Sequence, residues 1–473
     1  MILRATKRIC AFIFPALLLL LPLQGKSEQT GNPLDLLPSS LRTFLDYEQK
    51  HMSLSVDPTR INMGTGNKQD LHYAPENGNV FDLKSYWVKA DDLHVFESEV
   101  IDEKIRKTMF MEKDGVKFVR FFVHPESESL YENLLKNADS AGSYHATATS
   151  SSRSLLVWRE NETPFIAKVS LNKEVSAVVR NIPKSEISRS IGTNNTLLTS
   201  KDQLPKNFDW MQESLATIPK GMERGGLIIR ELPHGLAEGT RTVIPLFALY
   251  GGNSARGPPL LAKMIKQSGE PASVFIKNRI LDPFIKMWLS TTIDNGFSME
   301  AHAQNTLIEL DEHGLPNGKF VFRDLGGFDV DFAYRKKIGA PLVKSLPFVD
   351  DFNKEYHQYE LQNAIRGSLY NHFEGGFVYN LDQYIPEWMG EGLINQEKLG
   401  NGFFSHQLMD SFEKNYALRV GKKVEKMGSI VNCDRYVLAA RERLLKNLER
   451  KNAPPSRWSC IKGIFGLGLG TQH

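Results

Sequence analysis

The stretch GFSMEAHAQNTLIELDEHGLPNGKFVFRDLGG, residues 296–327, contains the most informative group of polar side chains in this sequence. Glu300, Asn305 and Asp324 offer two carboxylates and an amide oxygen, which are hard ligands of the kind that Mg²⁺ prefers. The run KFVF predicts a strand that ends beside Asp324 and continues into a glycine turn. Because Mg²⁺ commonly bridges phosphate oxygens, the pattern indicates a nucleotide site.

The same residues also allow a purely structural interpretation. Glu300 and Gln304 are four positions apart and would share the wet face of a helix. Asp324 would cap a turn, and His302 would be a hydrogen-bonded core histidine. The interval from Glu300 to Asn305 parallels the metal and substrate site of protein kinases, but the kinase glycine loop is absent. Spacing alone therefore leaves the structural and functional interpretations open.

Two basic residues upstream lie within apolar runs. Lys168 is in the middle of FIAKVSL, residues 165–171, and Arg180 lies within AVVRNI, residues 177–182. A lysine on the buried face of a strand needs an anion as its partner, whereas on an edge strand it would face solvent. Both positions are therefore candidates for binding an anionic ligand.

The sequence around these residues predicts a β-rich region. VKFVRFFV, residues 116–123, follows an Asp-Gly turn signal and predicts a strand. The composition of DSAGSYHATATSSSRS, residues 139–154, predicts a loop. Hydroxyl and backbone N–H groups of Ser151 and Ser152, with the guanidinium of Arg153, would bind phosphate there. The alternative for the loop is a flexible linker.

Composition excludes several classes of protein. The chain has 473 residues, of which 41% are hydrophobic and 24% charged, so whole-chain disorder and coiled coil are excluded. Lys and Arg total 58 against 55 Asp and Glu, a net charge of +3, which gives no support for nucleic-acid binding. We expect two or three lobes.

The first residues differ in composition from the rest. A basic start, the apolar run at residues 9–23 and a polar stretch predict that residues 1–27 are a signal peptide or an N-terminal membrane anchor. The run has 15 residues, whereas a membrane span needs about 20. Export would allow a disulfide between Cys433 and Cys460, but their redox state is open.

Taken together, three motifs resemble a known family. KVSLNKEVSAVVRNI, EAHAQNTLIEL and FVFRDLGG occur in the order found in the aerobactin-type (IucA/IucC), NRPS-independent siderophore synthetases. The intervals from Lys168 to Ser176 and Arg180 match that family, although Ser176 stands where the family usually has Thr. The resemblance covers residues 140–330 clearly and the later region loosely.

The resemblance implies an α+β fold shaped like a hand, a multi-lobe synthetase with a mainly helical C-terminal region. We accordingly expect an abbreviated thumb-like region at 28–138, which follows the signal peptide or anchor at 1–27. A fingers-like nucleotide-binding lobe should span 139–257, and a palm-like lobe with the Mg/ATP and acid site should span 258–455. A flexible tail is expected at 456–473.

The resemblance also implies an activity. Such a ligase adenylates citrate or a related polycarboxylate with ATP and Mg²⁺, then condenses it with an amine or alcohol in siderophore biosynthesis. By position, the catalytic residues would be Lys168, Arg180 and His302. The predicted nucleotide contacts are Ser151, Arg153, Lys168, Ser176, Arg180, His302 and Gln304. Of these, Gln304 would support the other contacts and not touch the nucleotide directly. The predicted metal ligands are Glu300, Asn305 and Asp324.

Three departures keep other hypotheses open. The family has a His-Pro-x-His-Pro type element well upstream of its Ser-x-Arg loop, whereas this chain has only His124-Pro125, close to that loop. The thumb is short. The start of the chain indicates export or membrane anchoring, whereas the family works in the cytoplasm, so localisation is open. The alternatives are an exported, non-catalytic relative that binds a ligand or protein, and a kinase-like phosphotransferase.

Residues that recognise the acid and the nucleophile are not identified by any motif. Arg366, Tyr370 and His372, in NAIRGSLYNHFEG, would suit a polycarboxylate if they shared a helix face, but they are not included among the predicted site residues. Dimers are common in the family that the chain resembles, so a homodimer is one expectation and the oligomeric state is open.

Overall fold

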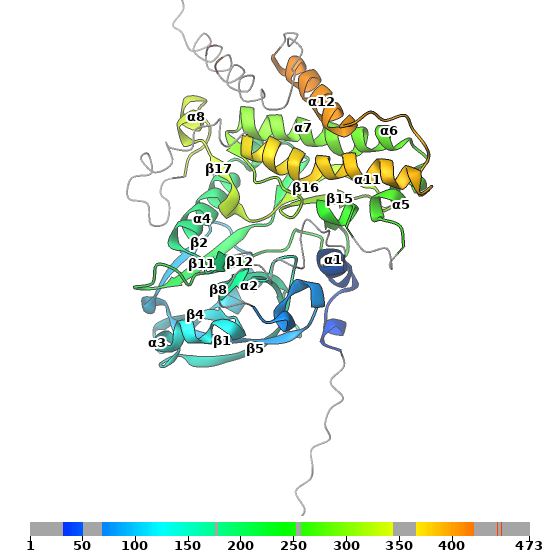
Figure 1. The fold of residues 1–473 in the computed structure, drawn as a ribbon. Helices are drawn as coiled ribbons and strands as arrows, with labels where there is room; N and C mark the ends of the chain where they lie inside the picture. The colour runs from blue at the N-terminus through cyan, green and yellow to red at the C-terminus, as the bar shows by residue number, and fades with distance from the viewer. Residues whose placement is uncertain are drawn as a thin grey trace, which may run out of the picture.

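The computed structural model describes residues 32–50, 69–175, 178–251, 257–343 and 366–420, together with positions 442 and 446. Its largest element is an antiparallel sheet of nine strands, at the bottom of Figure 1. In sheet order these strands are β2 (Leu93–Glu97), β11 (Glu213–Pro219), β12 (Leu227–Arg230), β7 (Phe165–Val169), β6 (Ser154–Trp158), β5 (Asp139–Ala148), β1 (Phe81–Lys89), β4 (Val116–Val123) and β3 (Phe110–Lys113).

The central strands of this sheet are buried on both faces. Side chains alternate between the faces of a strand, and in β6 Leu155 and Val157 enter one hydrophobic core while Leu156 and Trp158 enter another. The second core also contains side chains of α1 (Ser39–Lys50) and of the second sheet. Both faces of the sheet are therefore covered. We call the face that packs against α1 and the second sheet the inner face, and a polar side chain on it lies between the large sheet and the rest of the molecule.

Two sequence predictions in this sheet had different outcomes. The predicted strand 116–123 is confirmed as β4, which β3 joins through Asp114 and Gly115 at φ values of 53° and 75°. The predicted loop 139–154 is wrong for most of its length, because Asp139–Ala148 forms β5. Hydrogen-bonded ladders to β1 and β6 on either side outweigh the weak strand propensity of its Ser, Gly and Ala residues.

A second sheet of four strands lies between the large sheet and the helical layer. Its order is β10 (Phe208–Trp210), β16 (Pro316–Phe322), β15 (Thr306–Leu310) and β13 (Thr242–Pro245), with β10 parallel to β16 and the other pairs antiparallel. The predicted strand before Asp324 is thus confirmed as β16. Two short ladders complete the strands, β8 (Leu171–Val175) with β9 (Val178–Arg180) and β14 (Phe297–Ser298) with β17 (Asp329–Val330).

Helices form the upper layer in Figure 1 and pack on the second sheet through one large core. This layer contains α5 (Leu260–Ser268), α6 (Ala272–Ile276), α7 (Asp282–Leu289), α11 (Tyr379–Gly390) and α12 (Phe403–Val420), with π-helical segments at Lys277–Leu281, Ser290–Asp294 and Arg366–Val378. The remaining helices are α2 (Glu103–Met109), α3 (Glu132–Leu135), α4 (Lys184–Thr199) and α8 (Phe332–Lys337).

Short 3₁₀ helices connect many of these elements. They span Pro33–Leu36, Leu71–Tyr73, Pro75–Asn77, Ala90–Asp92, Pro125–Tyr131, Lys201–Gln203, Leu246–Leu249 and Leu325–Gly327. The last of these directly follows Asp324 and begins the glycine turn predicted from the sequence.

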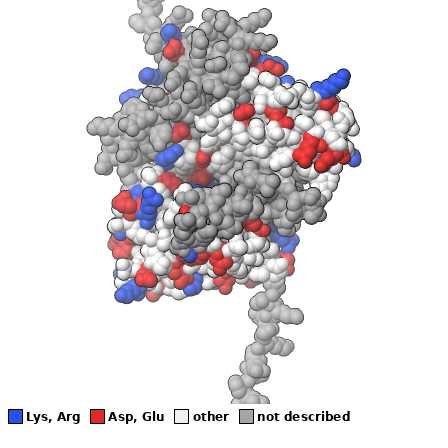
Figure 2. Space-filling model, viewed as in Figure 1, with Lys and Arg blue, Asp and Glu red and all other residues white. Residues whose placement is uncertain are grey.

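The mixed helix and sheet composition agrees with the predicted α+β class, while the hand-like division into lobes stays a prediction. The predicted boundary at residue 138 falls within the nine-stranded sheet, since β1 pairs with β5. None of the described helices is long and apolar enough to cross a membrane. The predicted signal or anchor, both cysteines of the suggested disulfide and the predicted tail lie outside the described residues. On the described surface seen in Figure 2, basic and acidic side chains are interspersed.

Candidate functional site

A polar cavity of about 290 Å³ lies between the loop that joins β5 to β6 and the segments that flank β15 and β16. We call residues 149–153 the serine loop, and residues 299–305 together with 323–327 the carboxylate wall. The cavity is lined by Thr149, Ser150, Ser151, Ser152, Arg153, Ser154, Val175, Arg180, Arg230, Glu300, His302, Gln304, Asn305, Arg323 and Asp324. Segments far apart in the sequence therefore meet around one polar space.

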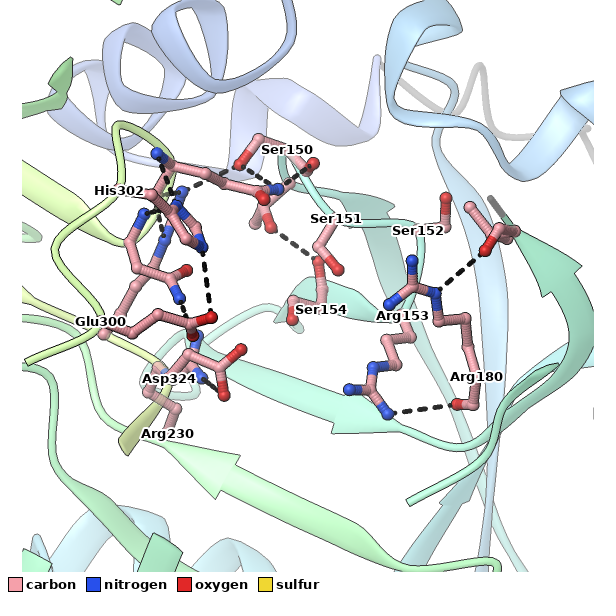
Figure 3. A pocket seen from close by; sticks show the side chains of 15 residues that line it. Ser150, Ser151, Ser152, Arg153, Ser154, Arg180, Arg230, Glu300, His302 and Asp324 are labelled. Carbon is pink, nitrogen blue, oxygen red and sulfur yellow. Dashed lines mark hydrogen bonds and ion pairs between the residues drawn. The ribbon is translucent and has the colours of Figure 1, made fainter. Parts of the chain in front are cut away.

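Figure 3 shows how the labelled side chains are distributed around this cavity. Arg153 and Arg180 lie on one side, Glu300 and Asp324 lie on the other, and Ser151 and Ser154 lie between them. The loop is closed by backbone hydrogen bonds, in which the N–H of Ser154 donates to the carbonyl of Ser151 at 3.1 Å. The fold thus places serine hydroxyls and guanidinium groups opposite carboxylates.

The two arginines are held in place by carbonyl groups and a carboxylate. Arg153 donates to the carbonyl of Arg180 at 3.2 Å and to Glu186 Oε1 at 3.1 Å. Arg180 Nε donates to the carbonyl of Val175 at 3.2 Å. Glu186 belongs to the first turn of α4 and was not predicted from the sequence. Its carboxylate orients Arg153 toward the cavity without closing off the guanidinium.

Lys168 is placed differently from the prediction. Its side chain, on the inner face of β7, is 2% exposed and is not among the cavity-lining residues. Its ammonium group contacts Asp324 Oδ1 and lies 2.6 Å from Glu186 Oε1. Burial alone would lower the pKa of Lys168, but the two carboxylates outweigh burial and raise it. The predicted anionic partner therefore consists of protein carboxylates, and the lysine stays charged.

Asp324 occupies an unusual backbone position at the end of β16. Its φ and ψ are 65° and 64°, in the left-handed region that few residues other than glycine adopt. Besides the contact with Lys168, Oδ1 lies 3.8 Å from the Arg230 guanidinium, which also binds Glu213. Burial would raise the pKa of Asp324, but Lys168 and Arg230 outweigh it and hold that pKa well below its usual range. The carboxylate is thus ionised and rigidly oriented.

A buried network ties the serine loop to the carboxylate wall. Arg323, 4% exposed, donates to Glu48 Oε1 at 2.7 Å, to Ser150 Oγ at 2.8 Å and to the carbonyl of Gln304. The amide of Gln304 donates to the carbonyl of Ser150 at 2.6 Å. Glu48 comes from α1 and was also missed by the sequence reasoning. Gln304 thus connects the two sides of the cavity.

His302 is oriented by the backbone of its own segment. Its Nδ1 accepts hydrogen bonds from the N–H groups of Gln304 and Asn305, each at 3.2 Å. Nε2 lies 3.9 Å from Glu300 Oε1. Burial, reinforced by the nearby His372, lowers the pKa of His302 to about 4. The ring is therefore neutral near pH 7, and because Nδ1 accepts, the proton belongs on Nε2.

Glu300, Asn305 and Asp324 meet as predicted at one end of the cavity. Asn305 donates through Nδ2 to Glu300 Oε2 at 3.1 Å, which leaves its amide oxygen for another partner. Burial, reinforced by the charge of Asp324, raises the pKa of Glu300 to about 7. Two carboxylates that repel each other, beside an amide oxygen, make a donor set that fits Mg²⁺.

Other types of metal site are not supported within the described ranges. No cluster of three or more His, Cys, Asp or Glu side chains is placed to hold a metal there. The amide oxygen of Asn305 would therefore be the third protein ligand. Ser176, the remaining predicted nucleotide contact, lies outside the described residues.

Glycines allow the carboxylate wall to pack closely. A Cβ atom at Gly327 would lie 2.2 Å from Glu300 Oε2, and one at Gly326 would lie 3.2 Å from Glu186 Cγ. Any side chain at position 327 would displace Glu300. Glycine at position 327 is therefore required by the position of the Glu300 carboxylate.

Comparison with known proteins gives two curated relatives. The chain is 25% identical over 360 residues to an L-2,3-diaminopropanoate–citrate ligase from Staphylococcus aureus, which covers 67% of this chain and 60% of the ligase. It is 26% identical over 324 residues to the rhizobactin siderophore biosynthesis protein RhbC from Rhizobium meliloti, covering 60% and 53%. The chain thus spans little more than half the length of either relative. No sequence profile of a protein family matches it.

Solved structures share the fold at low sequence identity. ATP-bound aerobactin synthetase IucA from Klebsiella pneumoniae superimposes with a TM-score of 0.59 at 17% identity, covering 88% of this chain and 78% of IucA. The petrobactin biosynthesis protein AsbB from Bacillus anthracis gives a TM-score of 0.58 at 16% identity, covering 88% and 75%. The architecture is therefore shared along most of the chain.

Proposed function

Because the chain is related in sequence and in fold to the aerobactin-type, NRPS-independent siderophore synthetases, we propose that it is a carboxylate–amine ligase that uses ATP and Mg²⁺. The acid is citrate or a related polycarboxylate, and the second substrate is an amine or an alcohol. The name of the Staphylococcus relative supports this choice of acid, and the ATP-bound state of IucA supports the choice of nucleotide.

One observation supports the proposal most strongly. A single cavity joins the serine loop, Arg153 and Arg180 to a carboxylate–amide group beside His302. Guanidinium and hydroxyl groups bind phosphate oxygens, whereas the carboxylates and the amide suit the cation that accompanies ATP. Neither group alone would distinguish a nucleotide site from a structural ion-pair network.

The chemistry has two steps. A carboxylate oxygen of the acid attacks the α-phosphorus of ATP, an O–P bond forms, and pyrophosphate leaves. The amine or alcohol then attacks the acyl carbon, AMP leaves with the bonding electrons, and the proton of the nucleophile passes to solvent. Neither step needs an enzyme nucleophile, so binding, orientation and charge stabilisation supply the rate acceleration.

Each described side chain has a role that follows from its geometry. Arg153 and Arg180 hold phosphate oxygens and offset the charge that develops on the α-phosphate. The Nε2–H of His302 donates toward the phosphate or the reacting carboxylate. Glu300 and Asp324, with Asn305, would hold Mg²⁺, which when bound neutralises charge on the phosphate oxygens.

Lys168 acts within this proposal through Asp324. Its ammonium group is enclosed by Asp324 and Glu186, so it fixes the orientation of the metal-binding carboxylate. It also adds a buried positive charge beneath the site, where the low dielectric makes that charge effective over a longer distance than in water. We therefore assign Lys168 as a positioning residue, whereas Arg180 and His302 face the reacting groups.

Exchange of labelled pyrophosphate into ATP tests the first step. The purified full chain should catalyse this exchange with citrate and Mg²⁺, and the Asp324→Asn variant should be slower by roughly 100-fold. Addition of an amine should release AMP. Release of ADP would instead support a phosphotransferase. Absence of exchange with a broad panel of acids, together with no thermal stabilisation by Mg-ATP, would contradict the proposal and favour a non-catalytic binding protein.

A further inference from the structure

The buried face of α1 carries a charged residue at a position where its spacing predicts an apolar one. Leu41, Phe44 and Leu45 lie on one face of the helix and enter the core between the large sheet and the second sheet. Glu48 occupies the next position of the same stripe and is fully buried. Burying a carboxylate costs free energy unless it is paired and hydrogen-bonded. Glu48 therefore requires partners, and each of its two oxygens has one.

The two oxygens of Glu48 bind opposite sides of the polar cavity. Oε2 accepts a hydrogen bond from the backbone N–H of Ser150, in the serine loop, at 2.9 Å. Oε1 accepts one from the guanidinium of Arg323, in the carboxylate wall, at 2.7 Å. Arg323 directly precedes Asp324, a proposed metal ligand. One side chain of α1 thus connects the loop that carries proposed phosphate contacts to the residue beside the proposed metal site.

Glu48 also balances the charge of Arg323. Arg323 is buried and lines the cavity, and Glu48 is the carboxylate that pairs with it among the described residues. Without Glu48, an unpaired positive charge would lie beside Asp324, where it would oppose a bound cation. The same charge would attract a phosphate group. Loss of Glu48 would therefore weaken binding of the metal without weakening that of the phosphates alone.

We propose that Glu48 is a positioning residue, which holds the serine loop and the carboxylate wall at the separation needed to bind ATP and Mg²⁺ together. This inference rests on the proposed ligase function and extends it to a residue of α1. A buried ion pair is weak evidence of a purely stabilising role, because apolar residues of similar volume often stabilise a protein equally well. A carboxylate that binds both sides of a ligand cavity is better explained by preorganisation, since a preorganised site loses less free energy in ordering its two sides when the ligand binds.

The benefit of Mg²⁺ to ATP binding measures this role. We define the Mg²⁺ ratio as the dissociation constant of ATP in EDTA divided by that in Mg²⁺, both from equilibrium dialysis of labelled ATP against the full chain. In Glu48→Gln the side chain keeps its size but loses the charge that pairs with Arg323. We expect the Mg²⁺ ratio to fall about tenfold, as is typical when a group that supports a metal ligand is lost. Metal-free ATP should bind at least as tightly as before.

Two further variants separate positioning from a general loss of stability. Gln49→Ala removes two hydrogen bonds from the same turn of α1, to Thr147 Oγ1 and to the carbonyl of Ala148, both of which go to β5 and not to the carboxylate wall. It should lower the midpoint of urea denaturation and leave the Mg²⁺ ratio unchanged. The double variant Glu48→Met with Arg323→Met replaces the ion pair by apolar side chains, so the urea midpoint should recover relative to Glu48→Gln. The Mg²⁺ ratio should stay low, because α1 no longer binds both sides of the cavity.

An unchanged Mg²⁺ ratio in Glu48→Gln would overturn the inference. So would a double variant in which the ratio recovers together with the urea midpoint, or an equal fall of the ratio in Gln49→Ala, since the effect would then come from stability alone. An unmodified chain that binds ATP equally with and without Mg²⁺, or does not bind it, would also overturn the inference, because the two sides would then not bind one ligand together.

The two proposals fail in different ways. Any of these results alongside continued pyrophosphate exchange contradicts the role of Glu48 alone. Absence of exchange in the unmodified chain contradicts the ligase, and in that case a Mg²⁺ ratio that falls in Glu48→Gln but not in Gln49→Ala would still identify Glu48 as a positioning residue of an ATP site.

Discussion

The serine loop and the carboxylate wall face each other across one cavity but are built in different ways. The serine loop connects β5 and β6, two strands with regular ladders on both edges, and closes through short local hydrogen bonds. The carboxylate wall has residues outside regular strands, a left-handed Asp324 and a glycine that allows Glu300 to pack closely. One side is therefore stabilised mainly by the sheet, whereas the other depends on specific side-chain contacts.

This difference predicts where substitutions act. Strained or closely packed positions persist only where the surrounding structure holds them, and they cluster at functional sites. We therefore expect changes at the carboxylate wall to affect the reaction directly. Changes in the sheet that supports the serine loop should affect stability first.

The largest loss of unfolding free energy is expected at Lys168, where the large sheet contacts Asp324 of the carboxylate wall. The Lys168→Met substitution keeps most of the side-chain volume but leaves Asp324 and Glu186 without their buried cation. Removing one partner of a buried ion pair costs about 3–5 kcal/mol of unfolding free energy. Urea denaturation of the purified chain measures this loss.

A double variant provides the control for this prediction. Adding Glu186→Gln to Lys168→Met removes one of the stranded charges, so it should recover part of the lost unfolding free energy. If the double variant is as unstable as the sum of the single variants, the three groups are not coupled. The contrast between the two sides would then lose its main support.

Sequence reasoning succeeded where the information is local. An apolar run identified β4, and the basic residue within another apolar run made Lys168 a candidate for a buried cation with an anionic partner, with solvent exposure on an edge strand as the alternative. The segment at Glu300 was recognised from residue types at short spacing. Each of these inferences used neighbours within a few positions, which is the range over which strand alternation and turn signals act.

The rest depends on contacts that no local pattern specifies. Glu48 and Arg323 are 275 positions apart, and their pairing exists only because α1 packs against the second sheet. Glu186 resembles any exposed residue at the start of a helix, yet it binds the buried Lys168 and the partly exposed Arg153. The strand β5 was missed because its small residues have low intrinsic strand propensity, and ladders on both sides decided its structure.

The second prediction tests whether a histidine on the sheet side is purely structural. Burial, reinforced by the charge of Lys173, lowers the pKa of His124 from 6.5 to about 3. Between these values the unfolded chain binds a proton that the folded chain excludes, so unfolding free energy should fall as pH decreases from 6.5 toward 3. At pH near 4.5 we expect this histidine to lower the unfolding free energy by about 3 kcal/mol relative to neutral pH.

A comparison with His124→Asn isolates this contribution from that of the carboxylates. Asparagine offers an oxygen that can replace Nδ1 as the acceptor for the N–H of Glu126, but it does not titrate. The variant should therefore lose less stability than the unmodified chain on acidification, as measured by thermal unfolding at several pH values. Parallel pH profiles for the two proteins would show that His124 can be protonated in the folded state.

A substitution in the carboxylate wall itself is expected to change the unfolding free energy least. It should nevertheless change the reaction clearly. In Gly327→Ala the new methyl group would lie 2.2 Å from Glu300 Oε2, so the carboxylate must move away from Asn305 and Asp324. The φ of residue 327 is not left-handed, so the backbone tolerates alanine, and we expect unfolding free energy to change by about 1 kcal/mol.

Displacement of a proposed metal ligand should raise the Mg²⁺ concentration needed for half-maximal pyrophosphate exchange by roughly tenfold, in line with the loss of one well-placed ligand contact. Gly326→Ala is the matched control, because its methyl group would meet Glu186 Cγ at 3.2 Å and no part of Glu300 is among its nearest atoms. If both variants need the same Mg²⁺ concentration, Glu300 does not hold the metal. The carboxylate wall would then be held together, like the sheet, for stability alone.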